Sequence, residues 1–329
     1  MKNCCVYLVS LVNKENTGGV VGRILQEKGC EVLVGDGTLH DEMLARCDAL
    51  VPYKAKITEE VLAKAPHLKV VSKFGVGMDR IDIEACTKRG IVAVNTPLAN
   101  CISVAEHAIA LMMASSKMLY FTSRALHQDE PDWKTARTRQ SVELYGKTLA
   151  VIGYGNIGKY VAKLAYGLGM RVLVWSRSLQ SDQILEYGDV VSSLDDAIAQ
   201  ADFVTLHVAG SASTKHFFGE RELRLMKPGA FLINTTRGFV VDEEALIRVL
   251  EEGSIRGAGL DVFDTEPMLP GNPLSRMDNV ILTPHSGAHT PEGHSRAEEL
   301  AAQNIIDVME GRMPKSALNA RELADRFPC

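Results

Sequence analysis

The sequence predicts an α/β protein built from two doubly wound parallel sheets, and three observations support this fold class. Short apolar runs alternate with segments of helical period along the chain, which is the order of elements that produces parallel sheets. These runs are apolar at nearly every position, as expected for strands that helices cover on both faces. The length of 329 residues corresponds to about two domains.

The predicted strands form two series. The first comprises residues 6–12, 31–34, 49–51, 70–72 and 92–95, and the second comprises residues 148–152, 172–175, 203–207, 231–234 and 280–283. Between the series, residues 102–118 carry apolar side chains at helical spacing and predict one long buried helix. Residues 125–141 are polar and contain Pro131, so we expect a loop there. Pro291 opens a further predicted helix, which ends before Gly311.

Composition disfavours several classes of protein. Hydrophobic residues make up 46% of the chain and charged residues 23%, which is ordinary for a globular protein. The formal net charge of −5 disfavours nucleic acid as the main partner. Seven scattered cysteines without a CxxC pair disfavour a disulfide framework and favour a reducing, cytoplasmic location. We expect no membrane span, because Glu106, His107 and Lys117 interrupt the best candidate.

A glycine-rich turn follows the predicted strand at residues 148–152. The turn reads Gly153-Tyr154-Gly155-Asn156-Ile157-Gly158. A helical stretch and the predicted strand at residues 172–175 complete a Rossmann-like βαβ unit. In such a unit the first glycine permits the tight turn, the second lets the backbone approach a pyrophosphate, and the third allows close helix–strand packing. The sequence therefore predicts a dinucleotide site at this turn.

The residues after 172–175 bear on the choice of dinucleotide. In NAD-binding units an acidic residue near the end of the second strand binds the ribose 2′-hydroxyl. Here that place reads Trp175-Ser176-Arg177. Ser176 can hydrogen-bond a 2′-phosphate and Arg177 can pair with it, so the sequence favours NADP. The alternative is that Arg177 is a solvated surface residue and NAD is accepted.

Three polar segments lie at or just after predicted strand ends, and they contain Arg237, Glu266 and His285. Ligands bind at the carboxyl ends of the strands in open α/β sheets, so we expect these side chains to converge on one site. His285 and His289 do not predict a metal site, because the intervening Gly287 breaks a helix that would place both on one face.

These segments, together with four others, resemble the D-isomer-specific 2-hydroxyacid dehydrogenases. The resemblance rests on residues 73–79, 95–97, 103–106, 146–149, 233–238, 260–267 and 283–287, which stand in the family's order. It implies a substrate-binding domain formed by residues 1–98 and 291–329, and a dinucleotide-binding Rossmann domain formed by residues 99–290. It also implies that the active cleft lies between the two domains.

The resemblance implies an NAD(P)-dependent oxidoreductase that transfers a hydride between nicotinamide and a small 2-oxo or D-2-hydroxy acid. It assigns His285 as the acid–base, Glu266 as the partner that holds its ring, and Arg237 as the clamp on the substrate carboxylate. Histidine suits this role because it titrates near neutrality, and a planar guanidinium matches a carboxylate. His289 is a competing proton donor.

The resemblance also assigns binding residues. Lys73, Val76 and Gly77 are implied to bind the substrate. The implied cofactor contacts are Val104, Gly153, Tyr154, Gly155, Asn156, Ile157, Gly158, Ser176, Arg177, His207, Thr235 and Asp261. Asp261 would accept a hydrogen bond from the carboxamide. Ala209 departs from the family pattern, which has proline there, and leaves the local loop geometry open.

Glyoxylate or hydroxypyruvate is the favoured substrate. Phosphoglycerate dehydrogenases carry an arginine where Pro52 stands, and we expect no regulatory domain after residue 329. Lys54 and Lys73 nevertheless keep 3-phosphoglycerate open as a substrate, whereas Val76 disfavours phosphite, whose oxidation is associated with a lysine at that position. A dinucleotide-sensing corepressor is the alternative from another functional class.

The resemblance further implies a homodimer formed through the cofactor domain. The surface expected for this contact comprises the predicted helix at residues 102–118 and the polar segment after it.

Overall fold

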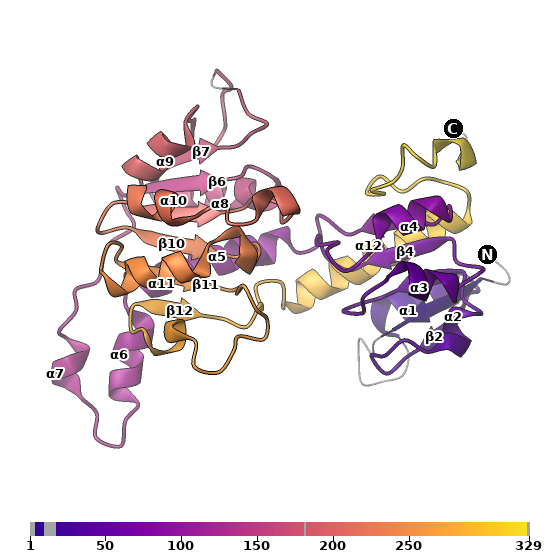
Figure 1. Ribbon diagram of the computed structural model, residues 1–329, viewed down its shortest axis with the longest axis horizontal. Helices are drawn as coiled ribbons and strands as arrows, with labels where there is room; N and C mark the ends of the chain where they lie inside the picture. The colour runs from indigo at the N-terminus through magenta and orange to yellow at the C-terminus, as the bar shows by residue number, and fades with distance from the viewer. Residues whose placement is uncertain (1–3, 10–17, 181, 328–329) are drawn as a thin grey trace. The chain divides into compact units, whose positions relative to one another are not determined.

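The computed structural model describes residues 4–9, 18–180 and 182–327. The chain divides into two compact units: unit 1 is Met1–Asn100 with Thr290–Cys329, and unit 2 is Cys101–His289. In its described part, each unit contains a parallel sheet with helices packed against it (Figure 1). The predicted fold class of two parallel-sheet α/β domains is therefore confirmed.

Unit 1 contains a five-stranded sheet of order β2-β1-β3-β4-β5 among its described residues. The strands are β1 (Cys5–Leu8), β2 (Glu31–Val34), β3 (Ala49–Val51), β4 (Val70–Lys73) and β5 (Val92–Asn95). Helices α1 (Gly19–Glu27) and α12 (Pro291–Met309) supply apolar side chains to the core on one face. Helices α2 (Asp41–Leu44), α3 (Glu59–Ala63) and α4 (Ile83–Lys88) supply those on the other. The strand predicted at 6–12 ends at Leu8, and residues 10–12 lie outside the described residues.

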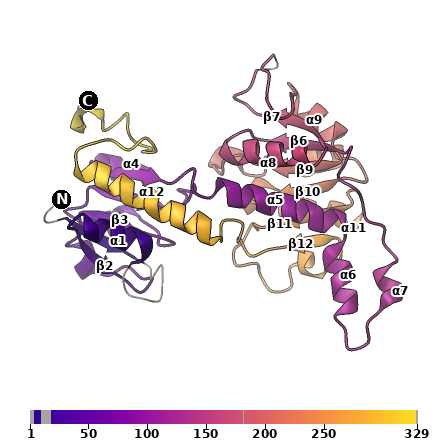
Figure 2. The same cartoon turned by 180° about the vertical axis from the view of Figure 1, so that it is seen from behind.

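Unit 2 contains a seven-stranded sheet of order β12-β11-β10-β9-β6-β7-β8 in the part that the structure describes. The strands are β6 (Thr148–Ile152), β7 (Arg171–Trp175), β8 (Asp189–Val190), β9 (Phe203–Leu206), β10 (Phe231–Asn234), β11 (Gly257–Leu260) and β12 (Val280–Leu282). Helices α5 (Cys101–Ser116) and α8 (Asn156–Gly167) pack side by side on one face, as Figure 2 shows. Helices α9 (Leu194–Gln200), α10 (Glu220–Leu225) and α11 (Glu243–Glu251) cover the other.

Two strands of unit 2 are absent from the predicted runs. Strand β8 has only two residues, too few to produce an apolar run. Strand β11 contains two glycines, which hide it from any search for apolar residues. One of them, Gly259, is needed for packing, because a Cβ there would lie 2.9 Å from the Cβ of Leu111 on α5.

The single helix predicted at residues 102–118 is wrong at its C-terminal end. Helix α5 ends at Ser116, and Met118 adopts a left-handed backbone conformation with φ of 55°. A separate helix α6 (Leu119–Leu126) follows, and the loop predicted at 125–141 contains the short helix α7 (Trp133–Ala136). In the described residues no helix is both long and apolar enough to cross a membrane.

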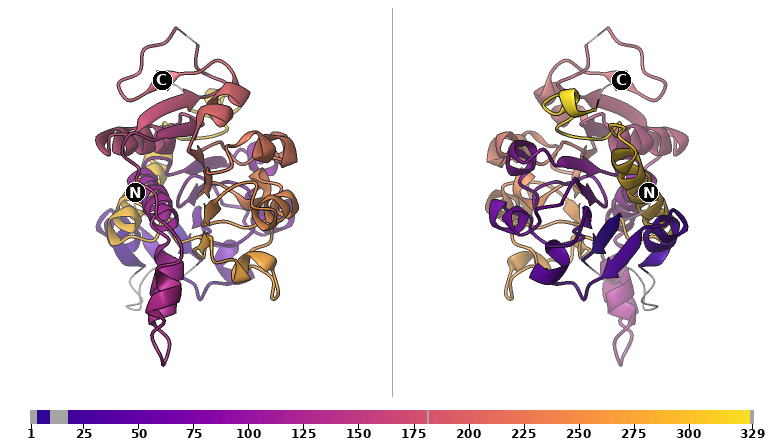
Figure 3. Two further views of the ribbon diagram at one scale, coloured as in Figure 1. Left: turned by 90° about the vertical axis from the view of Figure 1, so that its left-hand side faces the viewer. Right: turned by 90° about the vertical axis from the view of Figure 1, so that its right-hand side faces the viewer.

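Helices α6 and α7 form an arm that projects from unit 2 (Figures 1 and 3). Two arginines attach it to the body of the unit, because Arg124 and Arg139 lie 3.2 and 3.7 Å from the carboxylate of Asp278. The Arg139 guanidinium also lies 4.6 Å from the ring centroid of Phe121. The arm is thus fixed to unit 2 at its base.

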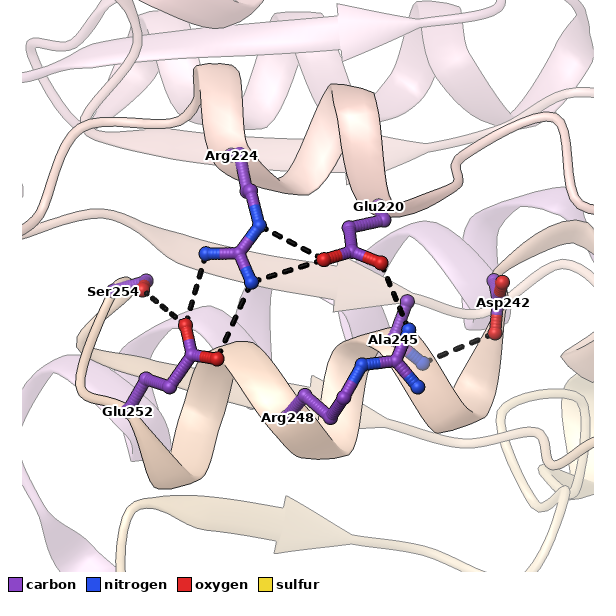
Figure 4. Close-up of polar contacts among 7 residues, drawn as sticks. All are labelled: Glu220, Arg224, Asp242, Ala245, Arg248, Glu252 and Ser254. Atoms are coloured by element: carbon purple, nitrogen blue, oxygen red, sulfur yellow. Dashed lines mark hydrogen bonds and ion pairs between the residues drawn. The ribbon is translucent and has the colours of Figure 1, made fainter.

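A surface network joins α10 to α11 (Figure 4). Arg224 binds Glu220 on its own helix and Glu252 just after α11, each at 2.9 Å. Arg248 of α11 reaches back to the second oxygen of Glu220, also at 2.9 Å. Asp242 caps α11 by accepting from the backbone N–H of Ala245. Exposed ion pairs contribute little singly, so this network chiefly fixes the alignment of the two helices.

The C-terminal segment completes unit 1. Asn319 is buried, donates to the carbonyl oxygen of Ile91, and accepts from the backbone N–H of Ala93, with an antiparallel bridge between Val94 and Ala317 beside it. These contacts cover the edge of β5, which would otherwise expose unpaired backbone groups.

A buried carboxylate links α12 to α1. Glu298 is 4% exposed, and its Oε2 accepts from the backbone N–H groups of Val20 and Val21 at 2.5 and 3.1 Å. These N–H groups belong to the first turn of α1, where no intrahelical acceptor is available. Glu298 therefore caps the first turn of α1 from a position 278 residues after Val20 in the chain.

Replacing Glu298 with leucine should destabilise the start of α1. The buried N–H of Val21 and the part-buried N–H of Val20 would lose their acceptor, at a cost of about 1–3 kcal/mol for an unsatisfied buried group. We expect amide hydrogen exchange in α1 to accelerate by roughly tenfold or more. Glu299→Leu is the matched control, because Glu299 is exposed on the same helix. Equal protection of α1 in the two variants would contradict the capping role.

Candidate active site

The carboxyl ends of β10, β11 and β12 lie side by side in unit 2. The register pairs Asn234 with Leu260 and Leu260 with Leu282. The polar segments that follow these three strands therefore leave the sheet at the same edge. Each segment supplies one member of the predicted catalytic set.

The structure brings His285 and Glu266 into direct contact. His285 Nδ1 lies 2.7 Å from Glu266 Oε2, and the two side chains are 46% and 36% exposed. A carboxylate only accepts, so Nδ1 carries the shared proton. His285 Nε2 makes no hydrogen bond to the described residues and is the ring atom that can exchange a proton with a bound molecule.

Several contacts keep Glu266 ionised and in place. Burial raises its pKa, but the hydrogen bond and charge of His285, the N–H of Phe263 and the charge of Arg237 together hold that pKa below its ordinary value. The loop that carries Glu266 is anchored by Glu243 of α11, which accepts from the backbone N–H of Asp264. The pair is thus preorganised as a carboxylate beside an imidazole.

Arg237 is positioned by the loop after β10. Buried Asn234 donates to the carbonyl oxygen of Arg237 at 3.1 Å and accepts from the backbone and hydroxyl of Thr236. The guanidinium donates to the carbonyl oxygen of Thr236 at 2.8 Å. Gly210 leaves room for the side chain, since a Cβ there would lie 2.6 Å from Arg237 Cγ. Arg237 contributes positive charge at Glu266, so all three predicted catalytic side chains influence one region.

Asp261 organises the turn that carries His285. It is 2% exposed, and its carboxylate accepts from Thr283 Oγ1 and from the backbone N–H groups of Ser286 and Gly287 at 2.6, 2.8 and 2.9 Å. Burial raises the pKa of Asp261, but these hydrogen bonds and one from His107 hold it below its ordinary value. The buried group is therefore a carboxylate.

The glycine turn has the geometry that a pyrophosphate requires. Gly153 has φ of 101°, and a Cβ there would lie 2.5 Å from the carbonyl oxygen of His207. A Cβ on Gly158 would collide with the carbonyl oxygen of Gly153. Gly155, by contrast, faces open space at the start of α8, where exposed Asn156 begins the first turn. Backbone N–H groups at the start of a helix attract a phosphate into such a space.

Two buried polar atoms near this turn have no partner among the described residues. They are His207 Nδ1, just after β9, and Thr235 Oγ1, just after β10. Burial lowers the pKa of His207 to about 3, so its ring is neutral, and Nε2 is engaged with Thr205 Oγ1 at 2.9 Å. Buried polar atoms normally find a partner. Together with the open space at Gly155, these atoms fit a dinucleotide bound along the strand ends.

The remaining predicted cofactor residues lie in unit 2 in different surroundings. Ser176 is half-buried beside Ser178, and Arg177 is exposed just after β7. Tyr154 and Ile157 are half-buried and Val104 of α5 is buried. The competing donor His289 lies in a turn, where its backbone N–H donates to the carbonyl oxygen of Ser286.

The predicted substrate residues lie in unit 1, in the loop after β4. Thr96 Oγ1 accepts from the N–H of Gly75 at 2.7 Å, and Asn95 Nδ2 donates to the carbonyl oxygen of Val76 at 2.8 Å. The N–H groups of Val76 and Gly77 donate to no described residue, and Val76 is 44% exposed. Lys73 Nζ donates to the carbonyl oxygen of Phe74. The loop therefore presents two adjacent backbone donors that suit an anion.

Sequence reasoning missed three residues that support the segments of the candidate site. Asn234, Thr283 and His107 are buried or half-buried and touch the segments that carry Arg237 and His285. Asn234 and Thr283 stand inside the motifs used for prediction, and His107 follows one directly. Their spacing in the sequence does not indicate these contacts, because the contacts depend on the order of the strands in the sheet.

Comparisons with known proteins identify the family. The model of the NAD-binding domain of D-isomer-specific 2-hydroxyacid dehydrogenases matches residues 109–287. A glyoxylate reductase of Korarchaeum cryptofilum is 39% identical over 291 residues, covering 87% of each chain. A D-3-phosphoglycerate dehydrogenase of Methanocaldococcus jannaschii is 40% identical over 302 residues, covering 90% of this chain. This chain spans only 57% of that relative.

Solved structures agree with the sequence relatives. A glyoxylate reductase from Paecilomyes thermophila superimposes with a TM-score of 0.85 at 27% identity, covering 98% of this chain and 100% of the other. The TT0316 protein from Thermus thermophilus gives a TM-score of 0.82 at 33% identity, covering 95% of this chain and 99% of the other. The protein described here thus belongs to the D-isomer-specific 2-hydroxyacid dehydrogenase family.

Proposed function

We propose that the protein is an NAD(P)-dependent reductase of small 2-oxo acids, with glyoxylate or hydroxypyruvate as the preferred substrate. The observation that carries the proposal is the His285–Glu266 pair, which leaves Nε2 of His285 available for proton transfer. The glyoxylate reductases among the relatives support this substrate class. Unit 1 acts as the substrate-binding domain and unit 2 as the dinucleotide-binding domain.

Each site residue has a role in this reaction. When bound, the nicotinamide supplies the hydride that reduces the carbonyl carbon. His285 gives the proton from Nε2 to the oxygen on which negative charge develops, while Glu266 holds the ring in place by accepting from Nδ1. Arg237 clamps the carboxylate and polarises the carbonyl. The backbone donors of Val76 and Gly77 and the charge of Lys73 also bind the carboxylate.

Different residues of unit 2 bind different parts of the dinucleotide. The backbone at Gly155, Asn156 and Ile157 receives the pyrophosphate. His207 Nδ1 and Thr235 Oγ1 hydrogen-bond to the dinucleotide and so gain the partners that they lack among the described residues. Asp261 retains acceptor capacity on Oδ2, which binds one N–H in the structure, and accepts from the carboxamide.

The alternative substrate is the phosphorylated acid of the 3-phosphoglycerate dehydrogenases. One specific observation favours it, namely 40% identity to a relative of that name. Lys54, which is exposed just after β3, and Lys73 at the end of β4 are cations of unit 1 that suit a phosphate. The six described cysteines are buried and form no disulfide with one another, which supports a reducing, cytoplasmic location for either reaction.

Turnover assays test the proposed reaction directly. NADPH and NADH are each offered with glyoxylate, hydroxypyruvate, pyruvate and phosphohydroxypyruvate, and loss of reduced nicotinamide absorbance is followed. We expect fastest turnover with glyoxylate or hydroxypyruvate, and a His285→Gln variant should lose about 10²–10⁴-fold in kcat. His289→Gln is the control, and a comparable loss of kcat in that variant would contradict the assignment of His285 as the acid. Dinucleotide binding without turnover of any acid would favour the sensor alternative.

The proposed cofactor is NADP. No carboxylate stands directly after β7, and exposed Arg177 follows half-buried Ser176 at the position next to the ribose in such folds. A 2′-phosphate there would receive a charge-assisted hydrogen bond from the guanidinium and a second from the serine hydroxyl.

An Arg177→Ala variant should lose its preference for NADPH. Removing a charge-assisted hydrogen bond worth about 1.5–3 kcal/mol weakens NADPH binding about tenfold or more relative to NADH. Titration of intrinsic fluorescence measures both dissociation constants. Arg171→Ala is the matched control, because Arg171 is exposed at the opposite end of β7. An unchanged NADPH/NADH ratio in Arg177→Ala would refute the 2′-phosphate contact.

We further propose that unit 2 dimerises through α5 and the arm. Leu119 and Tyr120 on α6 are 52% and 42% exposed, and Trp133 on α7 is 67% exposed. Large exposed side chains gathered on a projecting element mark an interaction surface. Because the arm is fixed at its base, these side chains are available to a second copy of the chain.

Sedimentation analysis should give the mass of two chains for the wild type and of one chain for Leu119→Ser/Trp133→Ser. The apolar area on the arm supplies the association energy, so its removal shifts the equilibrium to the monomer. Tyr166→Ser is the control, because Tyr166 is 57% exposed on α8 rather than on the arm. A dimer that survives the double substitution would place the interface elsewhere.

A further inference from the structure

Helix α5 carries a histidine, His107, that the proposed mechanism does not use and that contacts residues near His285. His107 Nε2 lies 2.9 Å from Thr283 Oγ1 and 3.3 Å from Asp261 Oδ1, and its side chain is 21% exposed. His107 and Thr283 are 176 residues apart in the sequence. The contact therefore joins α5 to the ends of β11 and β12.

The hydrogen bonds of this cluster run in one direction. The Thr283 hydroxyl lies 2.6 Å from Asp261 Oδ1, and an ionised carboxylate can only accept. The single hydroxyl proton therefore goes to Asp261. Thr283 Oγ1 must then accept from His107, which places a proton on Nε2 of that ring. The resulting chain, His107 to Thr283 to Asp261, is termed the His107 relay.

Asp261 transmits this relay to the backbone around His285. Its carboxylate accepts from the N–H groups of Ser286 and Gly287, and its carbonyl oxygen accepts from the N–H of His285 at 2.8 Å. Three successive backbone donors thus end on one residue. A shift of Asp261 would move the turn that carries the His285 ring.

His285 needs such support because its backbone is left-handed, with φ of 51°. A side chain other than glycine keeps that conformation only where its surroundings fix it. Packing adds to the hydrogen bonds at this point. A Cβ on Gly287 would lie 3.0 Å from Asp261 Oδ2 and 3.3 Å from His107 Cδ2, so the turn sits close against the relay.

We infer that His107 is a positioning residue for the acid–base histidine. Its Nε2–H donates to the Thr283 hydroxyl, which in turn donates to Asp261. This completes the set of donors that holds Asp261 as an ionised anchor for residues 285–287. This inference rests on the proposed function only in assigning the acid–base role to His285. His107 itself makes no contact with the His285–Glu266 pair in the described contacts and acts through the turn.

Two substitutions separate the hydrogen bond from the space that the ring fills. His107→Leu removes the donor and keeps a bulky side chain that a helix tolerates. His107→Gln keeps an N–H group at a reach similar to that of Nε2. His67→Leu is the matched control, because His67 is an exposed histidine of unit 1.

The first readout is independent of turnover. The Nδ1–H that His285 donates to Glu266 at 2.7 Å gives a downfield proton NMR signal, which a His285→Gln variant assigns by its absence. We expect this signal to disappear or shift in His107→Leu and to persist in His107→Gln and His67→Leu. A signal unchanged in His107→Leu, or missing from the wild type, would overturn the inference.

The second readout is kcat with the preferred 2-oxo acid. Displacing an acid by a fraction of an ångström predicts a loss of about tenfold or more in His107→Leu, with rescue to within about threefold in His107→Gln. Thr283→Val should cause a similar loss, and the double variant His107→Leu/Thr283→Val should be no worse than either, because both break one relay. Additive losses would refute the relay. If the wild type turns over no 2-oxo acid, the proposed function fails while the NMR result still decides the role of His107.

Discussion

The candidate site depends on one buried carboxylate, that of Asp261. A charge in the interior is stable only where donors surround it, and here a hydroxyl, two backbone N–H groups and an imidazole do so. In satisfying the charge, these donors bring together segments from α5, β11 and β12. The requirement to solvate a single anion thereby fixes the turn that carries His285. Glu266, which is more exposed and is carried by the loop after β11, then contacts the positioned ring at Nδ1.

The opposite condition holds farther along the same edge of the sheet, where polar atoms are left unsatisfied. Nδ1 of His207 and Oγ1 of Thr235 are buried without a partner among the described residues, and the start of α8 presents open backbone N–H groups beside Gly155. A ligand that supplies acceptors and donors here removes the free-energy cost of leaving these buried polar groups without hydrogen bonds. The strand ends of unit 2 therefore combine a rigid half, around Asp261, with a half that is completed by binding.

Much of this arrangement could be predicted from the sequence, and the limits have physical causes. Apolar runs and the glycine turn depend on local order, so the parallel strands and the βαβ unit at residues 148–175 are readable from the chain. Strand β11 is not, because glycines take the place of larger apolar residues in it, and one of them, Gly259, gives room to Leu111 of α5. His107 was equally hidden, since its partner Thr283 is brought near only by the order of strands in the sheet. The cofactor preference at Arg177 stays a prediction.

The cap that Glu298 places on α1 has a consequence for how the chain is made. Ribosomal synthesis releases the N-terminal segment first, yet the first turn of α1 obtains its acceptor only when a residue 278 positions later has emerged. Asn319, which covers the edge of β5, arrives later still. Unit 2 is continuous in the chain and can fold as soon as its last strand is released. Unit 1, whose strands are made before unit 2, is therefore completed after it, and the edge of β5 lacks its cover throughout that interval.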